Sequence, residues 1–162
     1  MEDYRNRIKK SIERYAKKEL PKQKAKRSHP ELLVQNACQE WFDTNGFDMT
    51  IIDSGYEYLN QSKVSEIGYS DSSGNVGALA VYVEFKAKGS LRNLSENQYR
   101  FLYRKIMQGC FAVCVDSSEL LDSLWRRWKA AGLKKKDLLL EVLPCKDKYH
   151  EVIDANDSPL FD

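Results

Sequence analysis

Three charged residues near the middle of the chain have types and a spacing that suit metal-dependent chemistry. Asp71 precedes Glu84 by thirteen residues, and Lys86 follows Glu84 by two on an otherwise apolar segment. Two carboxylates provide the oxygen ligands that hard cations such as Mg²⁺ or Mn²⁺ prefer, and the backbone carbonyl of Phe85 is a further candidate ligand. A nearby lysine can orient a nucleophile or shield a phosphate. The pattern alone has low specificity, because a surface Glu and Lys pair on a half-exposed strand looks the same.

A strand predicted from Val76 to Ala87 must position these side chains. Since side chains alternate along a strand, Glu84 and Lys86 share one face with Ala80 and Tyr82. A turn predicted within residues 71–75 returns the chain antiparallel and sets the Asp71 carboxylate beside Glu84. The opposite, core-facing set comprises Leu79, Val81, Val83 and Phe85.

Helices and further strands are predicted on both sides of this segment. Ser28 with Glu31 three residues later is a capping-box pattern that begins a helix, and Gly46 ends it. Ser95 is the predicted cap of a second helix that ends before Gly109. The predicted helices cover residues 28–46, 94–109 and 117–132, and the other predicted strands cover 47–53, 63–69, 110–116 and 137–144. Helices interleaved with strands favour an α/β fold with a mixed central sheet flanked by helices.

The length and composition favour one soluble domain. The chain has 162 residues, and its longest apolar run, residues 77–83, is far too short to span a membrane. The charged start argues against a secretory signal peptide. The four cysteines form no CxxC pair and are interpreted as buried thiols in a reducing, cytoplasmic environment.

Positive charge is concentrated at the N-terminus. Residues 1–28 carry eleven basic and four acidic side chains, a net +7, which leaves −5 for the rest of a chain whose total is +2. A basic arm of this kind, residues 1–27, favours a polyanionic partner such as nucleic acid. A solvated helix face is the competing interpretation. Apolar residues recur in the arm at helical spacing, which predicts a helix that packs on the body or on a second subunit: Tyr4, Ile8, Ile12 and Tyr15. Residues 146–162 are predicted to be a polar, loose tail.

Several short motifs together resemble the VRR-NUC branch of the PD-(D/E)XK nucleases. They are Glu31 and Gln35 in the first helix, GYSD at 68–71, VEFK at 83–86, and LSENQYRFLYRKIMQG at 94–109 followed by CFAVCVDSSEL. The resemblance covers about residues 28–120. It implies a restriction-endonuclease-like αβββαβ core within a domain of residues 28–145, to which a C-terminal helix and strand are added. Ser70 departs from the proline that the family usually has before the metal-binding aspartate.

The resemblance also implies roles for single residues. Asp71, Glu84 and Glu31 would be metal ligands for Mg²⁺ or Mn²⁺, and Lys86 would be the catalytic lysine. Gln35 and Gln98 would lie near the site. Glu31 and Gln98 each follow a serine by three residues, so helix capping is the competing interpretation of both.

The implied activity is metal-dependent hydrolysis of DNA, with branched or four-way-junction DNA as the favoured substrate and a homodimer as the expected assembly. Four basic residues flank the predicted site and would contact phosphates: Lys88, Arg92, Arg100 and Arg104. Two alternatives stay open. One is an inactive nucleic-acid-binding or protein-interaction module that retains the fold, and the other is a sequence-specific restriction enzyme, for which no added recognition domain is evident.

Overall fold

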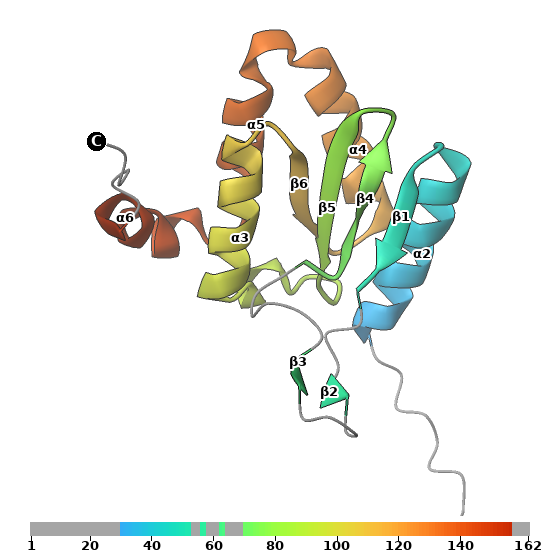
Figure 1. The fold of residues 1–162 in the computed structure, drawn as a ribbon, viewed down its shortest axis with the longest axis horizontal. Helices are drawn as coiled ribbons and strands as arrows, with labels where there is room; N and C mark the ends of the chain where they lie inside the picture. Colours follow the sequence, from blue (N-terminus) through green and yellow to red (C-terminus); the bar gives the residue numbers. More distant parts are fainter. Residues whose placement is uncertain (1–29, 53–55, 58–61, 64–69, 157–162) are drawn as a thin grey trace, which may run out of the picture.

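A four-stranded mixed sheet forms the centre of the fold. The structure is a computed structural model that describes residues 30–52, 56–57, 62–63 and 70–156. The strand order is β1-β4-β5-β6, with antiparallel pairing of β1 with β4 and of β4 with β5, and parallel pairing of β5 with β6 (Figure 1). In chain order the elements are α2 (Pro30–Thr44), β1 (Asp48–Ile51), β2 (Tyr56–Glu57), β3 (Ser62–Lys63), β4 (Ser72–Val76), β5 (Leu79–Phe85), η1 (Leu91–Asn93), α3 (Glu96–Met107), β6 (Phe111–Val115), α4 (Ser118–Ala130), η2 (Gly132–Lys134), α5 (Lys135–Val142) and α6 (Lys146–Asn156).

Helices cover both faces of the sheet, as the interleaved pattern predicted. Tyr82 of β5 packs edge-on against Phe101 of α3, so α3 covers the face to which Tyr82 points. Phe111 of β6 packs against Trp125 and Trp128 of α4, which covers the opposite face together with α2. The α/β class and the mixed sheet are confirmed. The three longer predicted helices are present as α2, α3 and α4, and Ser28, the predicted cap of α2, lies outside the described residues.

The hairpin that carries the charged residues has its turn later than predicted. Residues 72–76 form strand β4, and the chain reverses at Gly77, whose φ is +57°. Glycine adopts this left-handed backbone without a Cβ penalty. The expected turn at 71–75 is therefore wrong, and the following strand starts at Leu79 instead of Val76.

Strands β1 and β4 approach each other closely at Gly74. A Cβ built on Gly74 would overlap the backbone carbonyl of Asp48 in β1. Because no side chain fits there without moving one of the strands, glycine at this position allows β1 to pair with β4. Of the strand predicted over 63–69, only Lys63 is described. It belongs to β3, a two-residue strand paired with β2, and residues 64–69 lie outside the described residues.

The C-terminal part of the chain differs from prediction. Residues 137–144, predicted as a strand, belong mostly to helix α5, because Leu139 and Leu143, four residues apart, both turn inward. The predicted loose tail is also wrong for residues 146–156, which form α6. Tyr149 and Ile153 of α6, again four residues apart, are buried in the core. Residues 157–162 lie outside the described residues, as does the basic arm.

No helix within the described ranges has both the length and the apolar character needed to cross a membrane.

Replacing Ile153 by alanine tests whether α6 belongs to the folded domain. Ile153 is 1% exposed, so the loss of its side chain should lower the free energy of unfolding by about 2–5 kcal/mol. Glu151→Ala, two residues away and exposed, is the matched control and should change stability by less than about 0.5 kcal/mol. Denaturant unfolding measures both, and equal stabilities of the two variants would contradict the packing of α6.

Candidate functional site

The hairpin of β4 and β5 places Asp71 beside Glu84. Ser72 pairs with Val83 in the antiparallel register, so the residue before Ser72 lies next to the residue after Val83. Asp71 is held in place from the other side by its own backbone carbonyl, which accepts the N–H of Ile52 at 2.7 Å. The juxtaposition of the two carboxylates predicted from sequence is thus present.

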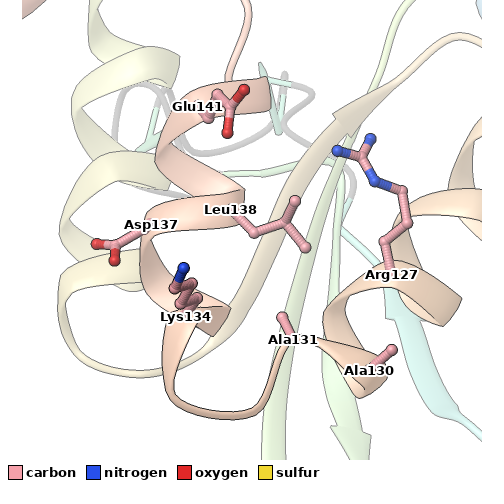
Figure 2. A pocket seen from close by; sticks show the side chains of 7 residues that line it. All are labelled: Arg127, Ala130, Ala131, Lys134, Asp137, Leu138 and Glu141. Carbon is pink, nitrogen blue, oxygen red and sulfur yellow. The ribbon is translucent and has the colours of Figure 1, made fainter.

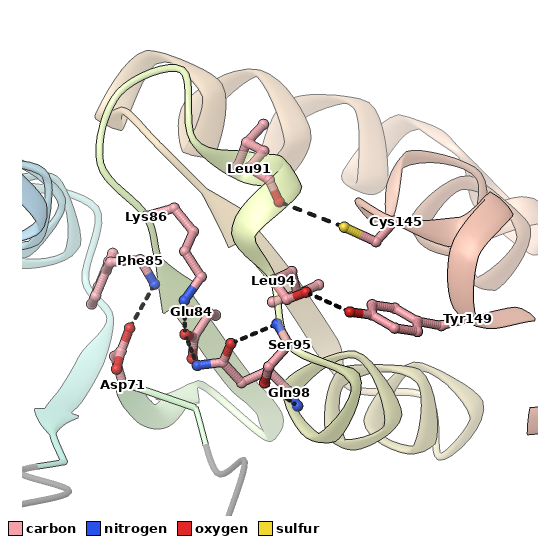
Figure 3. A network of polar contacts seen from close by, with 10 residues as sticks. All are labelled: Asp71, Glu84, Phe85, Lys86, Leu91, Leu94, Ser95, Gln98, Cys145 and Tyr149. Atoms are coloured by element: carbon pink, nitrogen blue, oxygen red, sulfur yellow. Dashed lines mark hydrogen bonds and ion pairs between the residues drawn. The ribbon is translucent and has the colours of Figure 1, made fainter. Parts of the chain in front are cut away.

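The Asp71 side chain binds the backbone of β5. Its Oδ2 accepts the N–H of Phe85, the residue between Glu84 and Lys86, at 2.8 Å (Figure 3). The backbone N–H of Lys86 in turn donates to the carbonyl of Val115 in β6 at 2.9 Å. Asp71 is therefore fixed to the same short stretch of chain that carries the other two charged residues.

Glu84 is buried on the face of the sheet covered by α3, with 1% of its surface exposed. Its Oε1 accepts hydrogen bonds from Lys86 Nζ at 2.7 Å and from Gln98 Nε2 (Figure 3). Its Oε2 is buried and has no hydrogen-bond partner among the residues that the structure describes. Lys86 itself is only 7% exposed, so the pair is not the half-exposed surface pair that was the competing interpretation.

Gln98 both caps a helix and contacts the site. Its Oε1 accepts the N–H of Ser95 at 3.0 Å, and its own N–H donates to the Ser95 hydroxyl at 3.3 Å, which completes a capping box at the start of α3. The remaining end of the amide, Nε2, donates to Glu84. The two interpretations of Gln98 left open by the sequence are therefore compatible in one side chain.

Helix α6 supports this capping box from behind, a contact that the sequence did not indicate. Tyr149 donates its hydroxyl proton to the carbonyl of Leu94 at 3.3 Å, and the Cys145 thiol lies 3.4 Å from the carbonyl of Arg92. Leu94 is 1% exposed and directly precedes Ser95 (Figure 3). The orientation of Gln98 toward Glu84 thus depends on a helix about fifty residues further along the chain.

Burial disfavours the charged forms of both carboxyl groups. Removal from water is the main cause that raises the pKa of Glu84 to about 7; the negative charge of Asp71 adds to it, and the bond from Lys86 opposes it. Burial likewise raises the pKa of Asp71, although the hydrogen bond from the N–H of Phe85 and the charge of Lys86 lower it. Burial alone would lower the pKa of Lys86, but its bond to Glu84 and that residue's charge outweigh burial and raise it.

The chemistry of this donor set fits a hard divalent cation. The half-buried carboxylate of Asp71 and the buried carboxylate of Glu84 face a single ammonium group, which leaves one negative charge uncompensated when both are ionised. The unpartnered Oε2 of Glu84 is an oxygen ligand that no other described residue uses. Within the described ranges, no three His, Cys, Asp or Glu side chains gather closely enough to hold a metal ion, so water or a phosphate would complete the coordination.

The other predicted site residues lie at different distances from this centre. Glu31 is exposed at the start of α2, near enough for its charge to raise the pKa of Asp71, and its role as a ligand stays a prediction, as does that of the Phe85 carbonyl. Gln35 is half-buried one turn further along α2. Of the four basic residues, Lys88, Arg92 and Arg104 are exposed, and Arg100 pairs with Glu96 at 3.0 Å on the surface of α3.

Two of the four cysteines are buried, in agreement with the interpretation as small apolar residues. Burial raises the pKa of Cys38 to about 12 and that of Cys114 still further, so neither thiol ionises near neutral pH. Cys114 pairs with Glu84 across β5 and β6 and lines the same side of the sheet. Cys110 and Cys145 are half-buried.

Comparison of the chain with models of known protein families gives no match, and comparison with curated proteins gives none either.

The buried carboxylates predict an unusual dependence of stability on pH. A carboxyl group whose pKa rises from 4.5 in the unfolded chain to about 7 in the folded protein binds its proton more tightly when folded. The protonated Glu84 therefore adds at most about 3 kcal/mol to the free energy of unfolding below pH 4.5. This stabilisation is lost as the pH rises through about 7. Raising the pH from 5 to 8 should destabilise the wild-type protein, and Glu84→Gln should remove most of this loss. Denaturant unfolding across this range without divalent cations measures it. Equal pH dependence in Glu84→Gln and the wild type would contradict it.

Proposed function

We propose that this protein is a divalent-metal-dependent nuclease that hydrolyses phosphodiester bonds in DNA. The observation that carries the proposal is the group of half-buried Asp71 with buried Glu84 and Lys86, in which one carboxylate oxygen of Glu84 has no partner among the described residues. Burial of two acids beside one base costs stability, and such arrangements are concentrated at functional sites. The resemblance of the sequence motifs to the VRR-NUC nucleases supports the same assignment.

Each residue of the group has a task that its position allows. Asp71 and Glu84 would hold Mg²⁺ or Mn²⁺, with the free Oε2 of Glu84 directed to the ion. The bound ion would supply charge neutralisation at the phosphate and a water molecule of lowered pKa. Lys86, whose pKa is raised, stays protonated at neutral pH and can donate to a phosphate oxygen or orient the attacking water.

Gln98 would keep Glu84 in a fixed orientation. Its amide is held at one end by the capping box and donates at the other end to Oε1. Because Oε1 is engaged by Gln98 and Lys86, Oε2 is the oxygen left for another ligand. Positioned ligands of this kind lower the reorganisation needed during catalysis.

Branched or four-way-junction DNA remains the substrate class that we propose, with a homodimer as the active assembly. Lys88 and Arg92 directly follow the catalytic segment and are exposed, so they can contact the phosphate backbone next to the cleaved bond. A dimer would present two such sites to two strands.

Isosteric variants test the catalytic assignment. Asp71→Asn and Lys86→Gln should each lower the rate of cleavage at least about a hundredfold, because they remove a metal ligand and the catalytic cation without changing the side-chain volume much. Labelled four-way-junction, flap, linear duplex and single-stranded DNA are incubated with Mg²⁺, Mn²⁺ or EDTA, and the rate of cleavage is measured. Asp43→Asn on the exposed surface of α2 is the matched control and should cleave like the wild type.

The pattern of outcomes separates the proposal from its rivals. Metal-dependent cleavage that both variants lose supports the nuclease, and the preferred substrate identifies its class. Tight DNA binding without cleavage under any metal would overturn the nuclease assignment and leave a binding module with the same fold.

A further inference from the structure

The connection from α4 to α5 carries a concentration of positive charge that the sequence analysis did not single out. Residues 126–136, named the basic turn here, include the end of α4, the short helix η2 and the start of α5. They contain six basic and no acidic residues: Arg126, Arg127, Lys129, Lys134, Lys135 and Lys136.

Part of this charge is used within the protein, and part is not. Arg126 pairs with Asp122 at 2.8 Å, and Lys135 Nζ lies 4.2 Å from the centre of the Trp128 ring. Lys134 and Lys136 are exposed, and within the described part of the chain neither has an ion pair. Leu133, which lies in η2 directly before Lys134, is fully exposed, at 104%. The basic turn therefore presents free cations on a protruding segment.

Helix stability does not explain these lysines. Arg127 and Lys129 in the last turn of α4 are favourable to that helix, because cations stabilise a helix C-terminus. Lys135 and Lys136 occupy the first turn of α5, where positive charge is unfavourable, and Lys134 at the N-cap makes no side-chain capping bond. Residues that destabilise the helix in which they lie are expected where they have a function other than stability.

The groove beneath the turn limits where a polyanion can lie. Arg127, Lys134 and Leu138 line it together with two acidic residues, Asp137 and Glu141, around a volume of about 400 Å³ (Figure 2). The two carboxylates would repel phosphates from the groove. A polyanion is therefore expected against the exposed ammonium groups of Lys136 and of Lys134, which also lines the groove, and not inside the groove itself.

The basic turn lies at the opposite end of the sheet from the proposed catalytic group (Figure 1). Trp128 packs on Phe111 at the beginning of β6, whereas Glu84 pairs with Cys114 near its end. The seven residues of β5 span about 23 Å, which corresponds to roughly seven base pairs of duplex DNA.

We infer that the basic turn is a second contact for the phosphate backbone of duplex DNA, which holds an arm of the substrate away from the cleaved bond. The inference rests on the proposed function, since it takes DNA as the ligand of this protein. The contact is independent of base sequence, because lysine ammonium groups on an exposed turn bind phosphates and do not select among base edges.

A double variant, Lys134→Gln with Lys136→Gln, tests the contact. Binding of a fluorescent 30-base-pair duplex is measured by anisotropy in EDTA, so that cleavage plays no part. The variant should bind roughly five- to thirtyfold more weakly at about 0.15 M salt, and the slope of log Kd against log salt should fall by about 1–2. The charge-preserving variant Lys134→Arg with Lys136→Arg should bind like the wild type.

The remaining outcomes separate this inference from the proposed function. In one outcome the double variant has a smaller slope of log Kd against log salt, but the wild-type protein does not cleave DNA with any metal. That outcome supports the basic turn as a DNA contact and rejects the nuclease. Metal-dependent cleavage with an unchanged salt slope rejects the basic turn alone. Unchanged DNA binding with weakened binding to phosphatidylserine vesicles would assign the turn to a membrane surface and overturn the inference.

Discussion

The antiparallel register of β4 and β5 is the constraint on which the proposed site depends. It brings two carboxylates together where access to water is restricted, so burial disfavours ionisation of both, and the charge of Asp71 further disfavours ionisation of Glu84. The neighbouring structure offsets this cost: Lys86 supplies a charge, Gln98 a hydrogen bond, and the Phe85 backbone an N–H donor. One uncompensated negative charge remains when both acids are ionised, so a cation bound there would stabilise the folded protein.

The parts of the fold with regular hydrophobic spacing were predictable from the sequence, and the parts with weak spacing were not. Helices α3 and α4 have clear caps and several buried positions each, so their bounds were close to prediction. Helix α5 contains three consecutive leucines, whose pattern fits a strand and a helix equally. Helix α6 buries Tyr149 and Ile153, too few positions to reveal a period in a segment of otherwise polar composition.

The residues that gather at the candidate site were predictable from the sequence, but their geometry was predictable only in part. The pairing of Asp71 with Glu84 followed from strand alternation and a nearby turn, although the turn itself lies at Gly77. Sequence indicated that Gln98 could cap α3, but its contact with Glu84 is tertiary and has no local signal. The support of Leu94 by Tyr149 joins residues 55 apart in the sequence, and only the packing of α6 shows it.

The close approach of β1 and β4 has a consequence for the recognition of distant relatives. A chain that keeps this hairpin must keep a residue without a side chain where Gly74 faces the Asp48 carbonyl, whereas at the tip glycine is favoured only by the left-handed backbone of Gly77 and no neighbouring atom excludes a side chain. Glycine therefore joins the three charged residues in one short pattern, D-x2-G-x9-E-x-K, which spans residues 71–86. Because this spacing is set by backbone contact and charge, we expect substitutions within it to disturb the hairpin more than substitutions of the surface residues around it.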